Sequence, residues 1–376
     1  MKEFRRYLKE YLRGADMLLL FLCVGASAFG CVLISSAART ANGGAMPLVR
    51  TQIISIVIGV FAYLLITAVS LDWLSKLWKW ILAFNVVFIL LIVPFGVTVG
   101  GNKSWLNFSW LPFRIGPPEV VKASFILLLA AQMYRFRENV SGFIPVAGYA
   151  AHTFFMVGMI LVICDDMGVA LIYIAILIAM MIGAGVKPVW FLALGGGIAA
   201  MTPLIWALLS DVRRERLLIS LNPMMDPYGR GWHILLSMRT LRGGGLTGQG
   251  LYKGVQVGSG DFPGISTDFI FSACGEELGL LGCGAVLLLL CAIIIRVLFI
   301  SRRAKSGLGA LICFGVAGMM IFQTFENVFM CAGVTPVIGI TLPFFSYGGS
   351  SNIVMFAAMG MVSSVKRHPK VTWLDY

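Results

Sequence analysis

The sequence predicts an all-α membrane protein with about ten transmembrane helices. Hydrophobic residues make up 59% of its 376 residues and charged residues only 12%, about half the charged share of a soluble domain. The mean hydropathy is +0.90, and apolar runs long enough to cross a hydrocarbon core of about 30 Å recur along the chain. Because backbone in lipid has to satisfy its own hydrogen bonds, we expect these runs to be helices.

The apolar runs place the helices in order, within one transmembrane domain over residues 1–376. A helix needs about 20 residues to cross the bilayer, and most of the predicted helices have nearly this length. The expected helices are 17–37, 51–70, 77–99, 117–134, 143–163, 167–186, 189–209, 279–300, 308–331 and 349–365.

The distribution of Lys and Arg predicts that both termini are cytoplasmic, because basic residues gather near the cytoplasmic ends of spans. Inner segments then hold the basic clusters at 2–13, 302–305 and 366–370, whereas the short outer loops hold few basic residues. The net charge of +12 follows from this topology and from contact with anionic membrane lipid, and it does not indicate nucleic-acid binding.

The segment 210–267 is the long connection, and the span count places it outside. Long loops in compact proteins are usually functional. Its stretch LRGGGLTGQGLYKG is rich in glycine, which permits close backbone approach to a phosphate or a sugar. A flexible surface loop explains the same composition, so both interpretations stay open. The loop carries the basic residues Arg213, Arg214, Arg216, Arg230, Arg239, Arg242 and Lys253.

The stretch STDFIFSACGEELGLLG places three carboxylates directly before an apolar run. One helix over 268–300 would be about 50 Å long at roughly 1.5 Å per residue, which is too long for the bilayer. We therefore expect a short outer helix from about 268 and a span that begins near Gly279. Asp268 falls on the face with the small residues, where another backbone can approach, whereas Glu277 points the opposite way.

The stretch NKSWLNFSWLPFRIGPPEVVKASFILLL opens the fourth predicted helix. Its two prolines suit the first helical turn, and Glu119 there complements the helix dipole. Lys122 lies at i+3 from Glu119, so the two form either a local ion pair at a helix end or a pair that faces the bundle interior. The aromatic residues before them, Trp105 included, form either an interfacial belt or a short re-entrant wall.

The stretch GVTPVIGITLPFFSYGGSS, residues 333–351, cannot continue a helix because it holds two prolines and a Gly-Gly turn. We expect it to dip back at the outer surface, since irregular backbone at membrane depth is tolerated where it lines a water-filled cavity. There it offers hydroxyl and amide donors, Ser346 among them.

These motifs resemble the SEDS family (shape, elongation, division and sporulation), to which RodA, FtsW and SpoVE belong. The stretches TDFIFSACGEELGLLG, GGGLTGQG and PVIGITLPFFSYGGSS carry the resemblance, which covers nearly the whole chain. It implies a peptidoglycan glycosyltransferase of the bacterial cytoplasmic membrane. Such an enzyme polymerises lipid II, a polyprenyl-pyrophosphate disaccharide, with a class B penicillin-binding protein as partner.

The resemblance also implies roles for single residues. Asp268 matches the essential aspartate of the family, and we expect it to be the general base that deprotonates the acceptor sugar hydroxyl. Cations stabilise a pyrophosphate leaving group, which is the role expected of the basic side chains. The expected substrate-binding residues are Trp105, Glu119, Lys122, Arg213, Arg216 and Ser346.

The chain departs from the family pattern at three places. Gly-Pro-Pro-Glu at 116–119 replaces a common Gln-Pro-Ser-Glu, Cys-Asp-Asp at 164–166 replaces Gln-Pro-Asp, and Pro-Gly-Ile-Ser at 263–266 replaces Pro-Glu-x-His. The departures spare Asp268, Glu119 and Lys122, so they leave the expected activity in place.

Two other functions remain open at this point. A transporter or lipid flippase would place acids near the bilayer midplane, for which Glu326 is the candidate, and would have two related halves. An inactive scaffold for a penicillin-binding protein would keep the same fold. No cofactor is predicted: a divalent cation could assist, but the eight cysteines mostly lie in apolar runs without C-x-x-C spacing, and no cluster marks a metal site.

Overall fold

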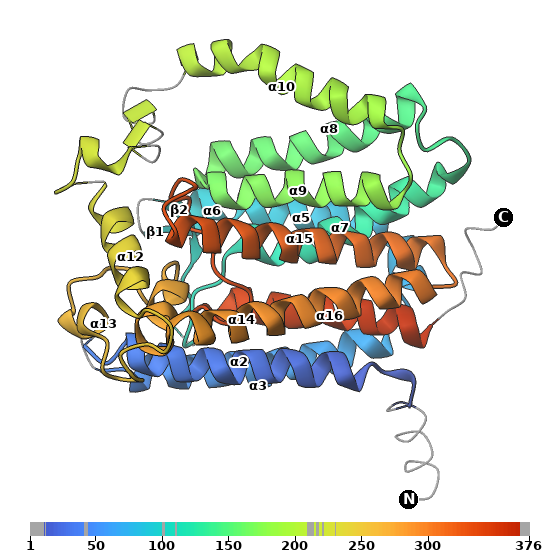
Figure 1. Ribbon diagram of the computed structural model, residues 1–376. Coiled ribbons are helices and arrows are strands. Elements are labelled where there is room, and N and C mark those ends of the chain that lie inside the picture. The colour runs from blue at the N-terminus through green and yellow to red at the C-terminus, as the bar shows by residue number, and fades with distance from the viewer. Residues whose placement is uncertain are drawn as a thin grey trace, which may run out of the picture.

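In the computed structural model, long helices run side by side and the connecting segments gather at the two ends of the bundle (Figure 1). The structure describes residue 11 and residues 13–40, 44–99, 102–109, 111–208, 214–215, 218–219, 222–229 and 231–368. A helix overlaps each of the ten predicted ranges. The helices are α2 (Met17–Ala37), α3 (Met46–Ala68), α4 (Leu71–Lys76), α5 (Trp78–Leu90), α6 (Ile92–Phe95), α7 (Pro117–Arg135), α8 (Phe143–Met159), α9 (Met167–Gly183), α10 (Pro188–Leu208), α12 (Trp232–Gly243), α13 (Val255–Ser259), α14 (Ile270–Arg303), α15 (Gly307–Cys331) and α16 (Gly349–Arg367).

Among the described residues, six helical segments are long and apolar enough to cross a membrane. They are Met17–Ala37, Met46–Ala68, Trp78–Phe95, Phe143–Cys164, Ile270–Arg303 and Gly307–Cys331. The helix α16 is less apolar, and it packs against α3, α7, α14 and α15 in the middle of the bundle. A polar helix is tolerated there because its side chains face protein rather than lipid. The chain is therefore an all-α polytopic membrane protein, as predicted.

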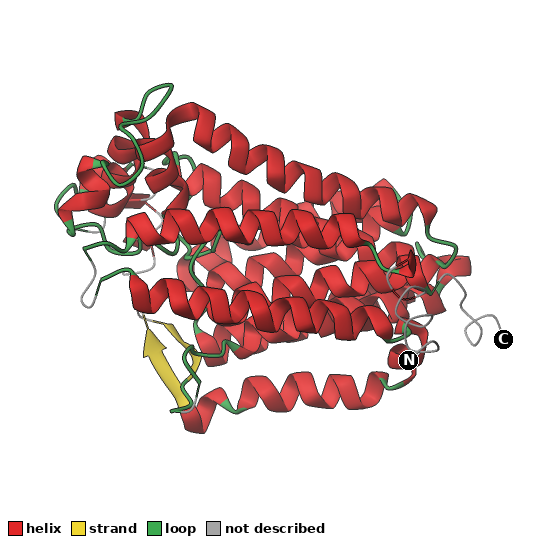
Figure 2. Cartoon of the chain, turned by 90° about the horizontal axis from the view of Figure 1, so that it is seen from below, coloured by secondary structure: helices red, strands yellow, loops and turns green. Residues whose placement is uncertain are grey.

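A small hairpin replaces the end of the third predicted helix. The helical segment stops at Phe95 rather than at 99, and β1 (Gly96–Val99) pairs antiparallel with β2 (Asn102–Leu106). Trp105 lies opposite Val97 in this pair, and Figure 2 shows the hairpin in yellow at one end of the bundle. Trp105 therefore lies in a strand at the end of the bundle and not in a helix.

The long helix α14 is broken where the sequence predicts a break. Gly279 has φ 65° and ψ −163° inside this 34-residue helix, a conformation that is essentially restricted to glycine. The outer piece begins at Ile270, and Asp268 therefore lies in the turn before the helix. The expected start at 268 had placed Asp268 in the first helical turn instead.

A buried ion cluster joins four helices at the opposite end of the bundle from the hairpin. Asp16, which is fully buried, precedes α2 and accepts a hydrogen bond from the Leu19 amide at 2.9 Å. Arg296 of α14 contacts its carboxylate at 2.6 Å, and Lys366 of α16 contacts it at 3.1 Å. The Tyr63 hydroxyl of α3 donates to the Asp16 carbonyl at 2.6 Å. The first and last described helices are therefore held together at one charged centre.

Candidate active site

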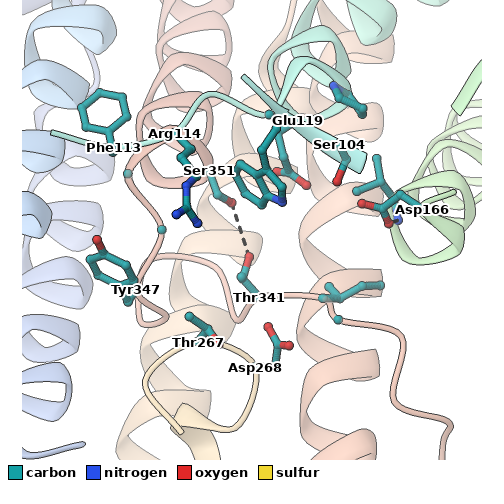
Figure 3. A pocket seen from close by; sticks show the side chains of 18 of the residues that line it. Ser104, Phe113, Arg114, Glu119, Asp166, Thr267, Asp268, Thr341, Tyr347 and Ser351 are labelled. Atoms are coloured by element: carbon teal, nitrogen blue, oxygen red, sulfur yellow. Dashed lines mark hydrogen bonds between the residues drawn. The ribbon is translucent and has the colours of Figure 1, made fainter. Parts of the chain in front are cut away.

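A cavity of about 780 Å³ lies at the hairpin end of the bundle (Figure 3). Its wall is built from β2, residues 111–114, the N-terminal parts of α7 and α9, the turn before α14, Gln323 of α15 and the segment 339–351. Three of the predicted site residues, Trp105, Glu119 and Asp268, line it although they are far apart in the sequence. Most of segment 333–351 is irregular, and part of it lines the cavity, in agreement with the prediction.

Asp268 projects into the cavity from a tight turn that begins at Gly264 (Figure 3). The amides of Thr267 and Phe269 both donate to the Gly264 carbonyl at 3.1 Å, and the positive φ of 74° at Gly264 suits glycine. Burial raises the pKa of the Asp268 carboxyl to about 6; the negative charge of Asp166 adds to the rise, and the Thr267 hydroxyl opposes it. A carboxyl with this pKa can exchange a proton near neutral pH.

Asp166 is a second cavity carboxyl, and the sequence reasoning did not select it as a site residue. It caps α9, where its Oδ1 accepts a hydrogen bond from the Val169 amide at 3.0 Å. Burial raises the pKa of Asp166 to about 6, with the charge of Glu119 adding to the rise and the Val169 amide opposing it. In a sequence, an aspartate directly before an apolar run usually indicates a helix cap. Only the fold shows that this cap also lines a cavity.

Glu119 and Lys122 form a buried ion pair rather than an exposed one. The Nζ atom of Lys122 lies 2.6 Å from Oε2 of Glu119, and the Lys122 side chain is 0% exposed. Glu119 lines the cavity, whereas Lys122 lies behind it. Such a pair costs desolvation energy that an exposed helix-end pair would not, so its presence beside a cavity suits a functional role.

Trp105 and the departure at residue 116 fit each other. A Cβ atom on Gly116 would lie 3.4 Å from the Trp105 ring and 3.3 Å from Cγ of Glu119, so glycine leaves room for both side chains at the wall.

The neighbouring Ser104 also lines the cavity, and its buried hydroxyl has no hydrogen-bond partner among the described residues.

Among the described lining residues, Arg114 is the one that carries a positive charge. In Figure 3 it lies near Phe113 and Ser351, on the other side of the view from Asp166. Gly348, Gly349 and Ser351 at the start of α16 line the same region. Arg213 and Arg216, the loop cations expected to contact pyrophosphate, lie outside the described residues.

Ser346 lies behind the cavity wall and not on it. Its hydroxyl donates to the Thr267 carbonyl at 2.6 Å and accepts from the Leu342 amide at 2.8 Å. The side chain is buried, and its neighbour Tyr347 lines the cavity instead. In the structure Ser346 therefore contacts the turn that carries Asp268, and its expected contact with substrate stays a prediction.

The glycine run packs into the break of α14 and does not border the cavity. The amides of Gln249 and Gly250 donate to the carbonyls of Glu276 and Glu277 at 2.9 Å, and the Leu280 amide donates to the Gly245 carbonyl at 2.9 Å. A Cβ atom on Gly248 would overlap the Glu277 carbonyl. Glycine is thus needed for helix docking, and the residues 243–254, all of which are described, contribute nothing to the cavity lining. These glycines therefore contact the backbone of α14, and the cavity lining gives no support to the phosphate-wrapping interpretation of this run.

The two glutamates that follow Asp268 hold the loop in place. The carboxylate of Glu276 accepts the amides of Gln256 and Val257, each at 2.9 Å. Glu277 accepts the Ser36 hydroxyl at 2.6 Å and lies 3.5 Å from Arg39. Of the three acids in this stretch, one enters the cavity and two are structural.

No group of three or more His, Cys, Asp or Glu side chains within the described part of the chain is placed to hold a metal ion. All eight cysteines are free thiols. The described lining of the cavity offers carboxylates, one guanidinium, hydroxyls and helix N-termini.

The comparisons with known proteins agree with this architecture. The family model of the FtsW, RodA and SpoVE cell cycle proteins matches residues 16–371. A probable peptidoglycan glycosyltransferase FtsW of Geobacter metallireducens is 30% identical over 98% of this chain and 99% of its own. The stage V sporulation protein E of Bacillus subtilis is 31% identical over 85% of this chain and 87% of its own. The peptidoglycan glycosyltransferase MrdB of Escherichia coli is 31% identical over 76% of each chain.

Solved structures show the same fold. A chain from a structure on the coordination of polymerization and crosslinking by a peptidoglycan synthase complex matches with a TM-score of 0.81 and 27% identity, over 95% of this chain and 99% of its own. The rod shape determining protein RodA of Thermus thermophilus matches with a TM-score of 0.69 and 25% identity, over 94% of this chain and 97% of its own. With a family match that spans nearly the whole sequence and relatives above 30% identity, this chain belongs to the SEDS family of FtsW, RodA and SpoVE proteins.

Proposed function

We propose that this chain polymerises lipid II into glycan strands at the outer face of the bacterial cytoplasmic membrane, with Asp268 as the general base. The chain is a peptidoglycan glycosyltransferase of the SEDS family. The observation that carries the residue assignment is the Asp268 carboxyl, which projects into the 780 Å³ cavity and whose pKa is raised to about 6. At neutral pH it is mostly ionised and still basic enough to take a proton.

The reaction joins an acceptor sugar to a donor sugar that is linked to polyprenyl pyrophosphate. The acceptor hydroxyl oxygen forms a bond to the anomeric carbon of the donor, and the bond from that carbon to the pyrophosphate oxygen breaks. Asp268 takes the hydroxyl proton, and the pyrophosphate leaves with the electron pair. Trp105 offers an aromatic face to a sugar ring, while Glu119 offers a hydrogen-bond acceptor on the same wall.

The leaving group needs positive charge at the side of the cavity away from the acids. Arg114 supplies a guanidinium there, and the uncapped first turn of α16 adds backbone amides at the positive end of its dipole. Lys122 acts from behind Glu119, whose charge it balances. Arg213 and Arg216 stay in the proposal as further partners of the pyrophosphate. Preorganised cations of this kind stabilise the charge that develops as the bond breaks.

The charges at the two ends of the bundle support the proposed side of the membrane. The end opposite the cavity carries Arg296, Lys366 and the pair Arg302 and Arg303, which suits the cytoplasm. Ten spans with both termini inside would then place the cavity and the loop 210–267 outside. A class B penicillin-binding protein is the proposed partner, supported by the synthase complex in which the structural relative was solved.

Polymerisation of labelled lipid II by the purified protein tests the proposal. Asp268→Asn should lower the rate by about 10²–10⁴-fold, since it removes a positioned base. Asp261→Asn, an exposed acid on the same loop outside the cavity, is the matched control and should keep the wild-type rate. Polymer from Asp268→Asn at a rate within about threefold of wild type would refute the base assignment. Movement of lipid II across vesicles without polymer would favour a flippase, and neither activity would favour a scaffold.

A further inference from the structure

We propose that Asn327 and Ser346 are positioning residues that fix the turn carrying Asp268 and thereby set the reach of its carboxylate. This inference rests on the proposed role of Asp268 as the base. Neither side chain lines the cavity, and both contact the backbone of the turn. The two residues come from different elements, α15 and the irregular segment before α16.

Asn327 holds the turn from the side of α15. Its Nδ2 atom donates to the Asp268 carbonyl at 2.7 Å and to the Ile340 carbonyl at 2.8 Å. Ile340 lines the cavity, so one amide group ties the turn to the neighbouring wall. The Asn327 side chain is fully buried, which leaves no water to replace either bond if the donor is lost.

Ser346 holds the same turn from the other side. Its hydroxyl donates to the Thr267 carbonyl at 2.6 Å, and the Tyr347 amide donates to the Ser266 carbonyl at 2.9 Å. Three successive carbonyls, at 266, 267 and 268, are therefore engaged by groups from outside the turn. The backbone under Asp268 is fixed more firmly than an ordinary surface turn.

The position of the carboxylate depends on this backbone. The Asp268 carboxyl interacts with the hydroxyl of Thr267, a residue of the same turn, so that contact moves with the turn and does not anchor it to the rest of the protein. A displacement of about 1 Å in a reacting group can cost roughly 10²-fold in rate. Loss of either anchor should therefore lower the rate of the chemical step and leave substrate binding largely intact.

The experiment compares purified Ser346→Ala, Ser346→Thr and Asn327→Leu with wild type in lipid II polymerisation, measuring kcat and KM. Ser346→Ala removes the hydrogen bond to the Thr267 carbonyl and the bond accepted from the Leu342 amide. Asn327→Leu removes both donated hydrogen bonds while nearly keeping the side-chain volume. We expect kcat to fall by about 10–100-fold with KM changed by less than about twofold. Ser346→Thr keeps the hydroxyl and should restore kcat to within about threefold of wild type.

Ser364→Ala is the matched control. The Ser364 hydroxyl donates to the Val69 carbonyl at 2.6 Å and the residue is 1% exposed, so the bond and burial resemble those of Ser346, but it lies at the other end of α16. Its kcat should equal that of wild type. Thermal unfolding of each variant identifies any that fail to fold, and Asn327→Leu and Ser346→Ala test the inference independently.

Unchanged kcat in Ser346→Ala and Asn327→Leu, while Asp268→Asn is inactive, would overturn the inference but keep the base assignment. A raised KM with unchanged kcat would overturn it in favour of direct substrate contact. An equal loss in Ser364→Ala would also overturn it, because any buried hydrogen bond would then have the same effect. An active Asp268→Asn would instead refute the base assignment on which the inference rests.

Discussion

Replacing Asp166 with asparagine should shift the acidic limb of the pH–rate profile to lower pH. The base has to be ionised to accept a proton, so activity should rise as pH increases through the pKa of Asp268. Burial and the charge of Asp166 raise that pKa from 3.8 to about 6. A neutral asparagine removes the charge that disfavours the ionised form of Asp268, so the pKa should fall and the limb should move to more acidic pH.

The size of the shift follows from the order of the two causes. The total rise is about 2 pH units, and burial contributes more than Asp166 does, so the substitution should lower the pKa by about one unit or less. With a pKa of about 6, roughly a tenth of the sites are ionised at pH 5; with a pKa of about 5, roughly half are. Activity at about pH 5, relative to the plateau, should therefore rise by at most about fivefold, and by less because Asp166 is itself largely protonated at that pH.

The shape of the profile gives a second readout. The pKa of Asp166 is also raised to about 6, so the two carboxyls of the wild-type protein titrate as an interacting pair and the limb should be broad. Asp166→Asn should sharpen it to a single ionisation. The assay is the initial rate of lipid II polymerisation across about pH 4.5 to 8.5, normalised to the plateau so that a lower maximal rate does not matter. Asp261→Asn should leave the limb in place, and a limb that stays or moves to higher pH in Asp166→Asn would refute the reasoning.

Three further outcomes are expected. Lys122→Met keeps the buried stem but removes the charge beside Glu119, so turnover should fall by at least about 100-fold with little change in Tm; wild-type turnover would reduce the pair to a local contact. Ser259→Cys, in a background without reactive native cysteines, should react with a membrane-impermeant maleimide in intact cells, because Ser259 is exposed and the loop is expected outside; labelling only in broken cells would reverse the topology. Gly279→Ala should destabilise the protein by about 1–3 kcal/mol in detergent unfolding, because the positive φ of 65° disfavours alanine and its Cβ would overlap the Gly248 amide; unchanged stability would mean that the break relaxes.

The helices were predictable because lipid imposes length and hydropathy on each of them. The break at Gly279 was predictable for the same reason, since one straight helix would exceed the bilayer. The hairpin at 96–106 was not, because the apolar run continues through the end of the helix and into β1 without a change in composition. Its residues form strands only because the chain turns back and Trp105 faces the cavity.

The site was predictable in part. The sequence motifs selected Asp268, Glu119 and Trp105, which the fold brings to one cavity. Asp166 shares that cavity, but its local pattern is that of a helix cap, and nothing in the sequence distinguishes a cap that faces solvent from one that faces a cavity. The glycine run is ambiguous as a signal for a related reason. Glycine permits close approach to a phosphate and to a helix backbone alike, and only the fold identifies the carbonyls at the break of α14 as its partners.

The ion cluster around Asp16 has a consequence for biogenesis. The aspartate is among the first described residues to enter the membrane region, and its partners Arg296 and Lys366 are synthesised much later. Until α14 and α16 are inserted, the carboxylate lacks its cationic partners, and burying it without them would cost about several kcal/mol. This end of the bundle can therefore close only after the last helix has been made. A chain truncated before Lys366 would leave the cluster incomplete, and membrane proteases could recognise it as unfinished.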